Sequence, residues 1–121
     1  MKHIKTPVTF VADPHAAPLY DQDGEFIGSA SFVGSSSATS IAREFVQAVN
    51  ALGNVSYDGP VAVCSLDGKM EDCEPFDHIQ DAIELARANA LQDRMAYAVW
   101  TEDDELIIVV PHTGDVFVKA G

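Results

Sequence analysis

The sequence predicts an α+β fold in which two amphipathic helices pack on a mostly antiparallel sheet of five to seven short strands. Three observations support it. β-Branched segments alternate with Asp-Gly turns, two longer segments repeat apolar residues at helical spacing, and the regular strand–helix alternation of a doubly wound sheet is missing. Since 121 residues suffice for one core, we expect residues 1–121 to form a single domain.

The first predicted strands lie before residue 30. Residues 6–12 are rich in β-branched and aromatic types, which indicates a strand. Residues 19–27 predict a hairpin, because Asp23-Gly24 suits the positive φ angles of a tight turn. The turn begins like a calcium loop, but Leu19 and Ala30 would occupy the first and last ligand positions of an EF-hand. We therefore interpret it as a plain turn.

The first predicted helix follows a serine-rich loop. Ser40 suits its N-cap and Gly53 its end. One face of this helix is apolar and is expected to enter the core; it comprises Ile41, Phe45, Ala48, Val49 and Leu52.

The second predicted helix opens with Asp77 and Gln80, whose spacing matches a capping box. Its apolar face is narrower and rich in alanine, and comprises Ile79, Ala82, Ile83, Ala86 and Ala90.

The remaining strands complete the sheet. Residues 61–64 predict one strand and residues 95–110 a hairpin. The five apolar residues of segment 106–110 predict a strand covered on both faces, by helices on one side and a partner on the other. This strand could therefore lie at a homodimer interface. Residues 116–118 predict a last edge strand.

The two cysteines are predicted to be thiols. If Asp67-Gly68 forms a two-residue hairpin loop, Cys64 faces Glu71 and Cys73 faces Ala62, so the two sulfurs are diagonal neighbours. We expect Cys64 in the core. Acidic neighbours would raise the pKa of the Cys73 thiol, which disfavours cysteine catalysis.

Acidic residues outnumber basic ones by 19 to 7, which makes the formal net charge −12. This charge opposes direct binding to nucleic acid or anionic membranes and favours a basic protein partner, although it could serve solubility alone. No apolar run is long enough to span a membrane, and the N-terminus lacks a signal-peptide core. The sequence thus predicts a cytoplasmic location.

The acidic residues gather in two segments, which we predict to bind the partner. In the predicted second helix, Asp77, Asp81 and Glu84 form a stripe with rises of about 6 and 4.5 Å, comparable to a phosphate backbone, so mimicry of nucleic acid is one interpretation. A soluble helix face is the other. The predicted partner-binding residues are Asp67, Glu71, Asp72, Glu74, Asp77, Asp81, Glu84, Glu102, Asp103 and Asp104.

An alternative site lies in the serine-rich loop. Its hydroxyls and backbone amides precede a helix and could bind an anion, although the lysine of a P-loop is missing. The candidates are Ser35, Ser36, Ser37 and Ser40. No histidine pair has metal-ligand spacing. His78 could serve as a base for Cys73, but the acidic neighbours of that thiol disfavour catalysis, so we predict no cofactor, no metal and no enzyme activity.

Residues 20–27, with their D-x-D-G turn, and residues 41–50, ending in Ala-Val-Asn, resemble small bacteriophage-encoded accessory proteins. The resemblance covers about residues 19–52. The resemblance implies an anti-defence factor that binds a host protein. It implies no catalytic residues. Together with the charge, it predicts a non-enzymatic acidic protein that binds a basic host protein, which could itself be a nucleic-acid-binding protein. The alternatives are a small-molecule or anion-binding domain and a dimerisation module.

Overall fold

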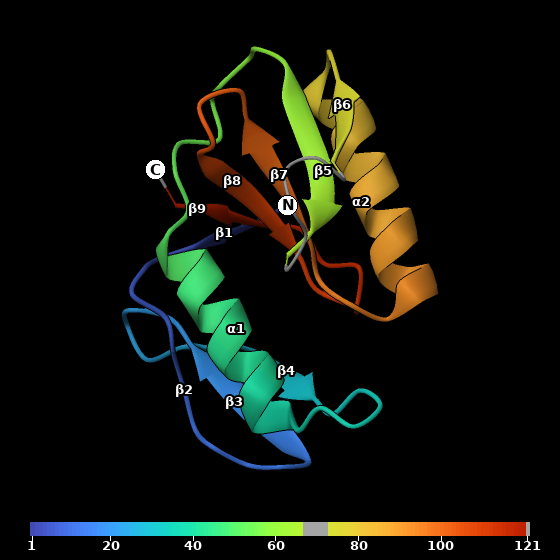
Figure 1. The fold of residues 1–121 in the computed structure, drawn as a ribbon. Helices are drawn as coiled ribbons and strands as arrows, with labels where there is room; N and C mark the ends of the chain where they lie inside the picture. Colours follow the sequence, from blue (N-terminus) through green and yellow to red (C-terminus); the bar gives the residue numbers. More distant parts are fainter. Residues whose placement is uncertain (67–72, 121) are drawn as a thin grey trace.

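The computed structural model describes residues 1–66 and 73–120, which form two sheets and two helices (Figure 1). One sheet has six strands in the order β1-β9-β8-β7-β5-β6, and the other has three in the order β2-β3-β4. The helices are α1 (Ala38–Asn50) and α2 (Ile79–Asp93). The strands are β1 (Lys2–Ile4), β2 (Thr9–Phe10), β3 (Ala16–Tyr20), β4 (Phe26–Ser31), β5 (Val61–Ser65), β6 (Glu74–Phe76), β7 (Tyr97–Thr101), β8 (Leu106–Val110) and β9 (Phe117–Lys119).

The predicted α+β class is confirmed, and all described strand pairs except β1–β9 are antiparallel. The described strands number nine in two sheets, more than the predicted five to seven in one. The predicted hairpin at residues 19–27 exists as β3–β4, with Gly24 at φ +79° in its turn. Of the strand predicted at residues 6–12, only Thr9–Phe10 (β2) forms a strand. No helix in the described ranges is long and apolar enough to cross a membrane.

The two helices cover opposite faces of the six-stranded sheet (Figure 1). Side chains of α2 pack with Val99, Ile108 and Val110, whereas side chains of α1 pack with Ala98 and Val109, which alternate with them along the strands. On its other side α1 packs against β2, β3 and β4. The molecule is therefore layered as α2, large sheet, α1 and small sheet.

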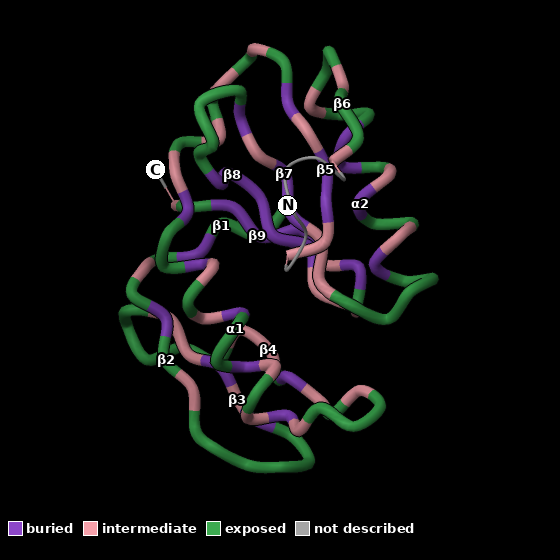
Figure 2. Tube along the Cα trace, in the orientation of Figure 1, coloured by how far each residue is buried: buried purple, intermediate pink, exposed green. Residues whose placement is uncertain are grey.

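Strand β8 lies inside the large sheet, and all five of its residues are buried (Figure 2). Both of its faces are covered by helices of the same chain, because α1 and α2 each contact it. The expectation that a partner covers one face of Leu106–Val110 is therefore wrong, whereas a homodimer as such stays a prediction. The predicted edge strand at residues 116–118 is also corrected, since β1 pairs in parallel outside β9.

Helix α1 begins earlier than predicted. Its N-cap is Ser37, whose hydroxyl accepts a hydrogen bond from the Ser40 amide at 3.2 Å, so Ser40 is not the cap. The predicted apolar face is confirmed, with Phe45 and Val49 buried.

Helix α2 lacks the predicted capping box. Its N-cap is His78, which makes no side-chain capping bond, because the helix starts one residue later than an Asp77 cap requires. The predicted apolar face is confirmed at Ala82, Ile83 and Ala86.

Cys64 and Cys73 form a disulfide, with their Cα atoms 4.5 Å apart, so the prediction of two thiols is wrong. In the β5–β6 pair Val63 lies opposite Glu74, and this register places Cys64 opposite Cys73. A two-residue loop at residues 67–68, which lie outside the described part of the chain, would have shifted the register by two. The prediction of a buried Cys64 is confirmed.

Candidate functional site

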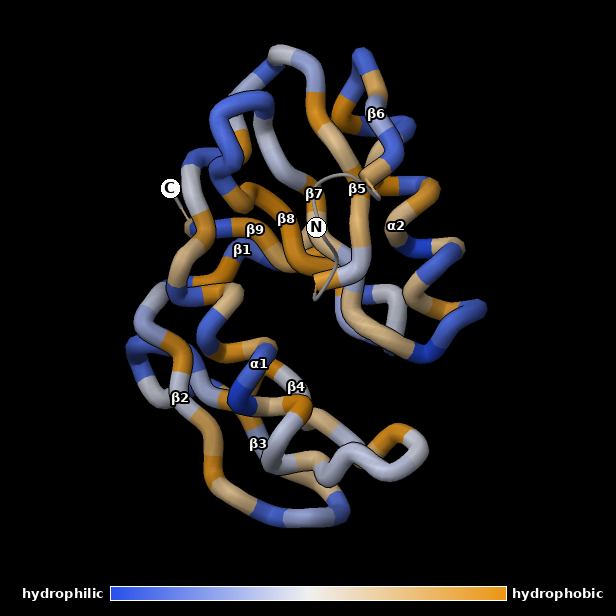
Figure 3. The backbone as a smooth tube through the Cα atoms, viewed as in Figure 1, coloured by the Kyte–Doolittle hydropathy of each residue, from blue (hydrophilic) through white to orange (hydrophobic). Residues whose placement is uncertain are grey.

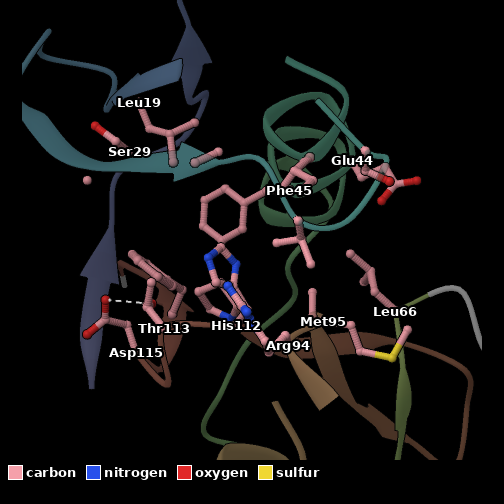
Figure 4. Close-up of a pocket in the computed structure, with 18 of the residues that line it drawn as sticks. Leu19, Ser29, Glu44, Phe45, Leu66, Arg94, Met95, His112, Thr113 and Asp115 are labelled. Atoms are coloured by element: carbon pink, nitrogen blue, oxygen red, sulfur yellow. Dashed lines mark hydrogen bonds between the residues drawn. The ribbon is translucent and has the colours of Figure 1, made fainter. Parts of the chain in front are cut away.

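A cavity of about 410 Å³ lies between the small sheet, α1 and the loops at one end of the large sheet (Figure 4). We call it the interlayer cavity. Its wall is mainly apolar and aromatic, which suits burial of an organic ligand. The apolar lining includes Leu19, Ile27, Ile41, Phe45, Met95 and Phe117.

A β-bulge shapes the side of the cavity formed by β4. Leu19 pairs with Gly28 and Tyr20 pairs with Phe26, so Ile27 is the extra residue of the bulge and lines the cavity. Gly28 has φ +142°, a region that side chains disfavour, and a Cβ there would meet no atom within 4 Å. The backbone conformation, and not the available space, therefore accounts for glycine at this position.

His112 enters the cavity from the loop after β8. Its Nε2 atom lies 3.2 Å from the Ser31 hydroxyl, and this contact joins the loop to the small sheet. Burial of the ring, and secondarily the positive charge of Arg94, lower the pKa of His112 below its usual value of 6.5. The imidazole is therefore neutral at pH 7 and can exchange hydrogen bonds with a ligand.

Arg94 follows the last turn of α2 and lines the same cavity. It has φ 54° and ψ 46°, the left-handed conformation that helix C-termini usually assign to glycine or asparagine. Its side chain lies beside that of His112 below the Phe45 ring (Figure 4). Among the described residues no carboxylate forms an ion pair with Arg94.

Three carboxylates of the described residues line the cavity, and two of them have partners. Asp93 accepts a hydrogen bond from the Tyr97 hydroxyl, which raises the pKa of Tyr97 to about 12, with burial of the phenol adding to the effect. Asp115 accepts a hydrogen bond from Thr113 at 3.1 Å and lies 3.6 Å from the Lys2 amine. The third, Glu44, is exposed on α1.

Of the predicted anion-binding serines, only Ser36 lines the cavity. Ser37 and Ser40 bond to each other, and Ser35 is exposed. The amide of Ser36 donates to the Val33 carbonyl, and the Ser40 amide donates to Ser37, so these amides are already occupied. The loop thus contributes the Ser36 residue to the cavity wall, and the amides of Ser36 and Ser40 are not available to bind an anion.

Five of the predicted acidic residues lie at the opposite end of the large sheet. Val61 pairs with both Phe76 and Thr101, so the residues that follow, Asp77 and Glu102, leave the sheet on either side of β5, about 10 Å apart. The hydrophilic turn after β7 and the start of α2 are visible in Figure 3. We call the exposed residues here the acidic end; they are Asp77, Asp81, Glu102, Asp103 and Asp104.

The other predicted acidic residues lie elsewhere. Glu84 is exposed one turn beyond Asp81 on α2, and Glu74 is exposed in β6. Asp67, Glu71 and Asp72 lie outside the described residues.

Sequence patterns did not indicate Arg94 and His112, because one lies just past a helix and the other in a separate loop. Only the fold brings them together. In the described ranges no group of three or more His, Cys, Asp or Glu side chains could hold a metal ion. Comparisons of the chain with protein-family models, curated proteins and solved structures find no match.

Proposed function

We propose that this protein binds a small organic molecule in the interlayer cavity and catalyses no reaction on it. The observation that carries the proposal is the cavity itself, whose volume of about 410 Å³ falls within the range of ligand sites. Its wall combines many apolar side chains with a few polar groups, among them His112, Arg94 and Thr113. Ligand sites typically combine an apolar wall that buries the ligand with a few polar groups that orient it.

The experiment is a fragment screen read by thermal unfolding and by NMR of methyl and aromatic groups. Binding in the cavity should raise the unfolding temperature and shift the signals of Ile27, Ile41 and Phe45 together. Ser29→Phe places a ring at an exposed cavity-lining position and should abolish both effects. Thr9→Phe adds the same ring at an exposed position on β2 and should preserve them. Shifts confined to other surfaces would refute the proposal.

A second candidate function is the binding of a basic host protein by the acidic end. The sheet register favours it, because Asp77 and Glu102, far apart in sequence, leave the same end of the sheet on either side of β5. The net charge of −12 would accelerate encounter with a basic partner. The resemblance of residues 19–52 to bacteriophage accessory proteins supports the same proposal, in which the acidic end acts as a nucleic-acid mimic.

Charge reversal tests this second proposal. Asp77→Lys with Asp81→Lys should weaken retention on an immobilised basic protein at moderate salt. Glu25→Lys with Glu44→Lys changes the net charge equally at exposed positions away from the acidic end, and should have a smaller effect. Equal losses in the two double variants would reduce the interaction to net charge and remove the proposed site.

The disulfide is relevant to the cellular location of the protein. A cytoplasmic location stays a prediction, and the Cys64–Cys73 disulfide argues against it, because such crosslinks are rare in the reducing cytosol.

A further inference from the structure

We propose that Arg94 and His112 bind the carboxylate of a small amphipathic acid whose apolar, aromatic part fills the interlayer cavity. This inference rests on the proposed ligand-binding function and adds the chemical class of the ligand. It follows from four features of the cavity: the position of the arginine, its backbone conformation, the state of the neighbouring carboxylates and the aromatic wall.

The arginine is positioned to receive an anion. Its side chain is exposed and lines the cavity beside the His112 imidazole, while the carboxylates of Glu44 and Asp115 lie to either side (Figure 4). In a chain with 19 acidic residues, Arg94 has no ion pair with any described carboxylate. A guanidinium matches a carboxylate with two parallel hydrogen bonds, and a neutral imidazole can donate a third.

The backbone at Arg94 provides a second, independent observation. A left-handed conformation costs a non-glycine residue about 1 kcal/mol, and glycine would remove that cost at this helix end. Residues in such conformations occur frequently at ligand sites, where the side chain is needed. Arginine at this position therefore indicates that its side chain serves the cavity at the expense of stability.

Two of the described carboxylates that line the cavity have partners other than Arg94. Asp93 is engaged by the Tyr97 hydroxyl, and Asp115 is engaged by Thr113 and Lys2. Neither of these two carboxylates forms an ion pair with Arg94, and no other described carboxylate does. A ligand carboxylate can then take the place next to the guanidinium.

The wall favours an aromatic body on the acid. Phe45 and Phe117 pack edge to face with ring centroids 5.0 Å apart, and both line the cavity. A third ring can extend such an arrangement with a gain beyond its buried area. Ile27, Ile41 and Met95 complete the apolar surface around it.

The test uses three probes with one body and different head groups: 3-phenylpropionate, 3-phenylpropionamide and 3-phenylpropylamine. Calorimetry and NMR at pH 7 should give dissociation constants for each. We expect the acid to bind about tenfold or more tightly than the amide, since charge-assisted hydrogen bonds are the stronger ones, and the amine to bind most weakly.

Variants assign the preference to Arg94. Arg94→Gln should weaken binding of the acid about tenfold and leave binding of the amide unchanged. Arg94→Gly should do the same while the free energy of unfolding stays equal or rises. Arg43→Gln removes one positive charge at an exposed residue of α1 that does not itself line the cavity, and should leave all three affinities unchanged.

The outcomes separate the two proposals. Equal binding of acid and amide, or tighter binding of the amine, would overturn the carboxylate subsite and leave the ligand-binding function standing. Equal effects of Arg94→Gln and Arg43→Gln would reduce the preference to long-range charge and also overturn the subsite. If no probe of any charge perturbs the residues that line the cavity, both proposals fail.

Discussion

The Nε2 atom of His112 lies 3.2 Å from the Ser31 hydroxyl, and this contact connects the loop after β8 with the last residue of β4. It therefore links the two sheets across the interlayer cavity. A titratable side chain at such a junction makes the stability of the junction dependent on pH.

We predict that the protein loses stability as the pH falls from about 7 to 5. Burial, followed by the charge of Arg94, lowers the pKa of His112 in the folded state below 6.5. The unfolded chain therefore takes up a proton before the folded chain does, so this contribution to stability is complete above pH 6.5 and decreases as the pH falls through the folded pKa. Urea unfolding at several pH values measures the slope.

His112→Gln provides the matched comparison, since it keeps a hydrogen-bonding side chain without a titratable ring. Its stability should depend less on pH between 7 and 5 than that of the wild-type chain. Hydrogen bonds from the His15 and Ala16 amides lower the pKa of Asp13 below its usual value of 3.8. The stability that Asp13 provides is therefore lost only below about pH 3.8, outside the range from 7 to 5. An identical slope in His112→Gln would show that other groups carry the dependence.

Local patterns predicted much of the fold. The buried positions of α1 follow from helical spacing at Phe45 and Val49, and the β3–β4 turn follows from Gly24. These features depend on residues close in sequence. The covering of β8 by both helices and the β5–β6 register depend on distant contacts, so the pattern at Leu106–Val110 indicated burial without showing what buries it.

The candidate site was the least predictable part. Ile27 reaches the cavity through a bulge, and Arg94 reaches it because α2 ends there in a left-handed residue. No motif and no spacing of apolar residues in the sequence predicts the bulge at Ile27 or the left-handed conformation of Arg94. The acidic end was predicted in part. Its residues were identified from the sequence, but their common position at one end of the sheet depends on the pairing of β6 and β7 with β5.

We predict that reduction of the Cys64–Cys73 disulfide lowers the free energy of unfolding by about 2–3 kcal/mol. The two cysteines are separated by 9 positions, and closing a loop of roughly this length restricts the unfolded chain by that amount. Urea unfolding with and without reductant measures the difference. A Cys64→Ala, Cys73→Ala variant controls for the reductant and should not respond to it. An unchanged midpoint on reduction would contradict the crosslink's stabilising role.

We predict that Gly28→Ala destabilises the protein by about 1–3 kcal/mol although a methyl group fits. The cost arises from φ +142°, since no atom lies within 4 Å of the added Cβ. Gly34→Asn is the control, because φ +57° is a left-handed conformation that asparagine tolerates; it should change stability by less than about 0.5 kcal/mol. Equal effects at the two positions would exclude the backbone explanation.

We predict that Tyr97 ionises with a pKa of about 12 and that Asp93→Asn moves this value towards 10. The hydrogen bond to Asp93 is the largest cause of the raised pKa, with burial and the charge of Asp93 following. NMR of the tyrosine rings at alkaline pH follows the titration. Since the folded pKa is raised, this contribution to stability is present below pH 10 and is lost as the pH rises towards 12. Asp103→Asn, on the distant turn after β7, should have no effect on Tyr97.

We predict that Asn50→Ala costs about 1–2 kcal/mol and loosens the segment before β2. The Asn50 side chain accepts a hydrogen bond from the Val8 amide at 2.7 Å and donates one to the Val8 carbonyl at 3.2 Å. Val8 is only 2% exposed, so its backbone groups would lose their partners with little access to water. Urea unfolding should show the loss, and hydrogen exchange at the Val8 amide should accelerate more than exchange in β8.

Gln47→Ala on the exposed side of the same helix is the comparison for Asn50→Ala, because no hydrogen bond to another described segment depends on that side chain. It should change stability by less than about 0.5 kcal/mol. If the two alanine variants are equally stable, the bond pair does not hold Val8 against α1, and the packing of Val8 alone must fix this segment.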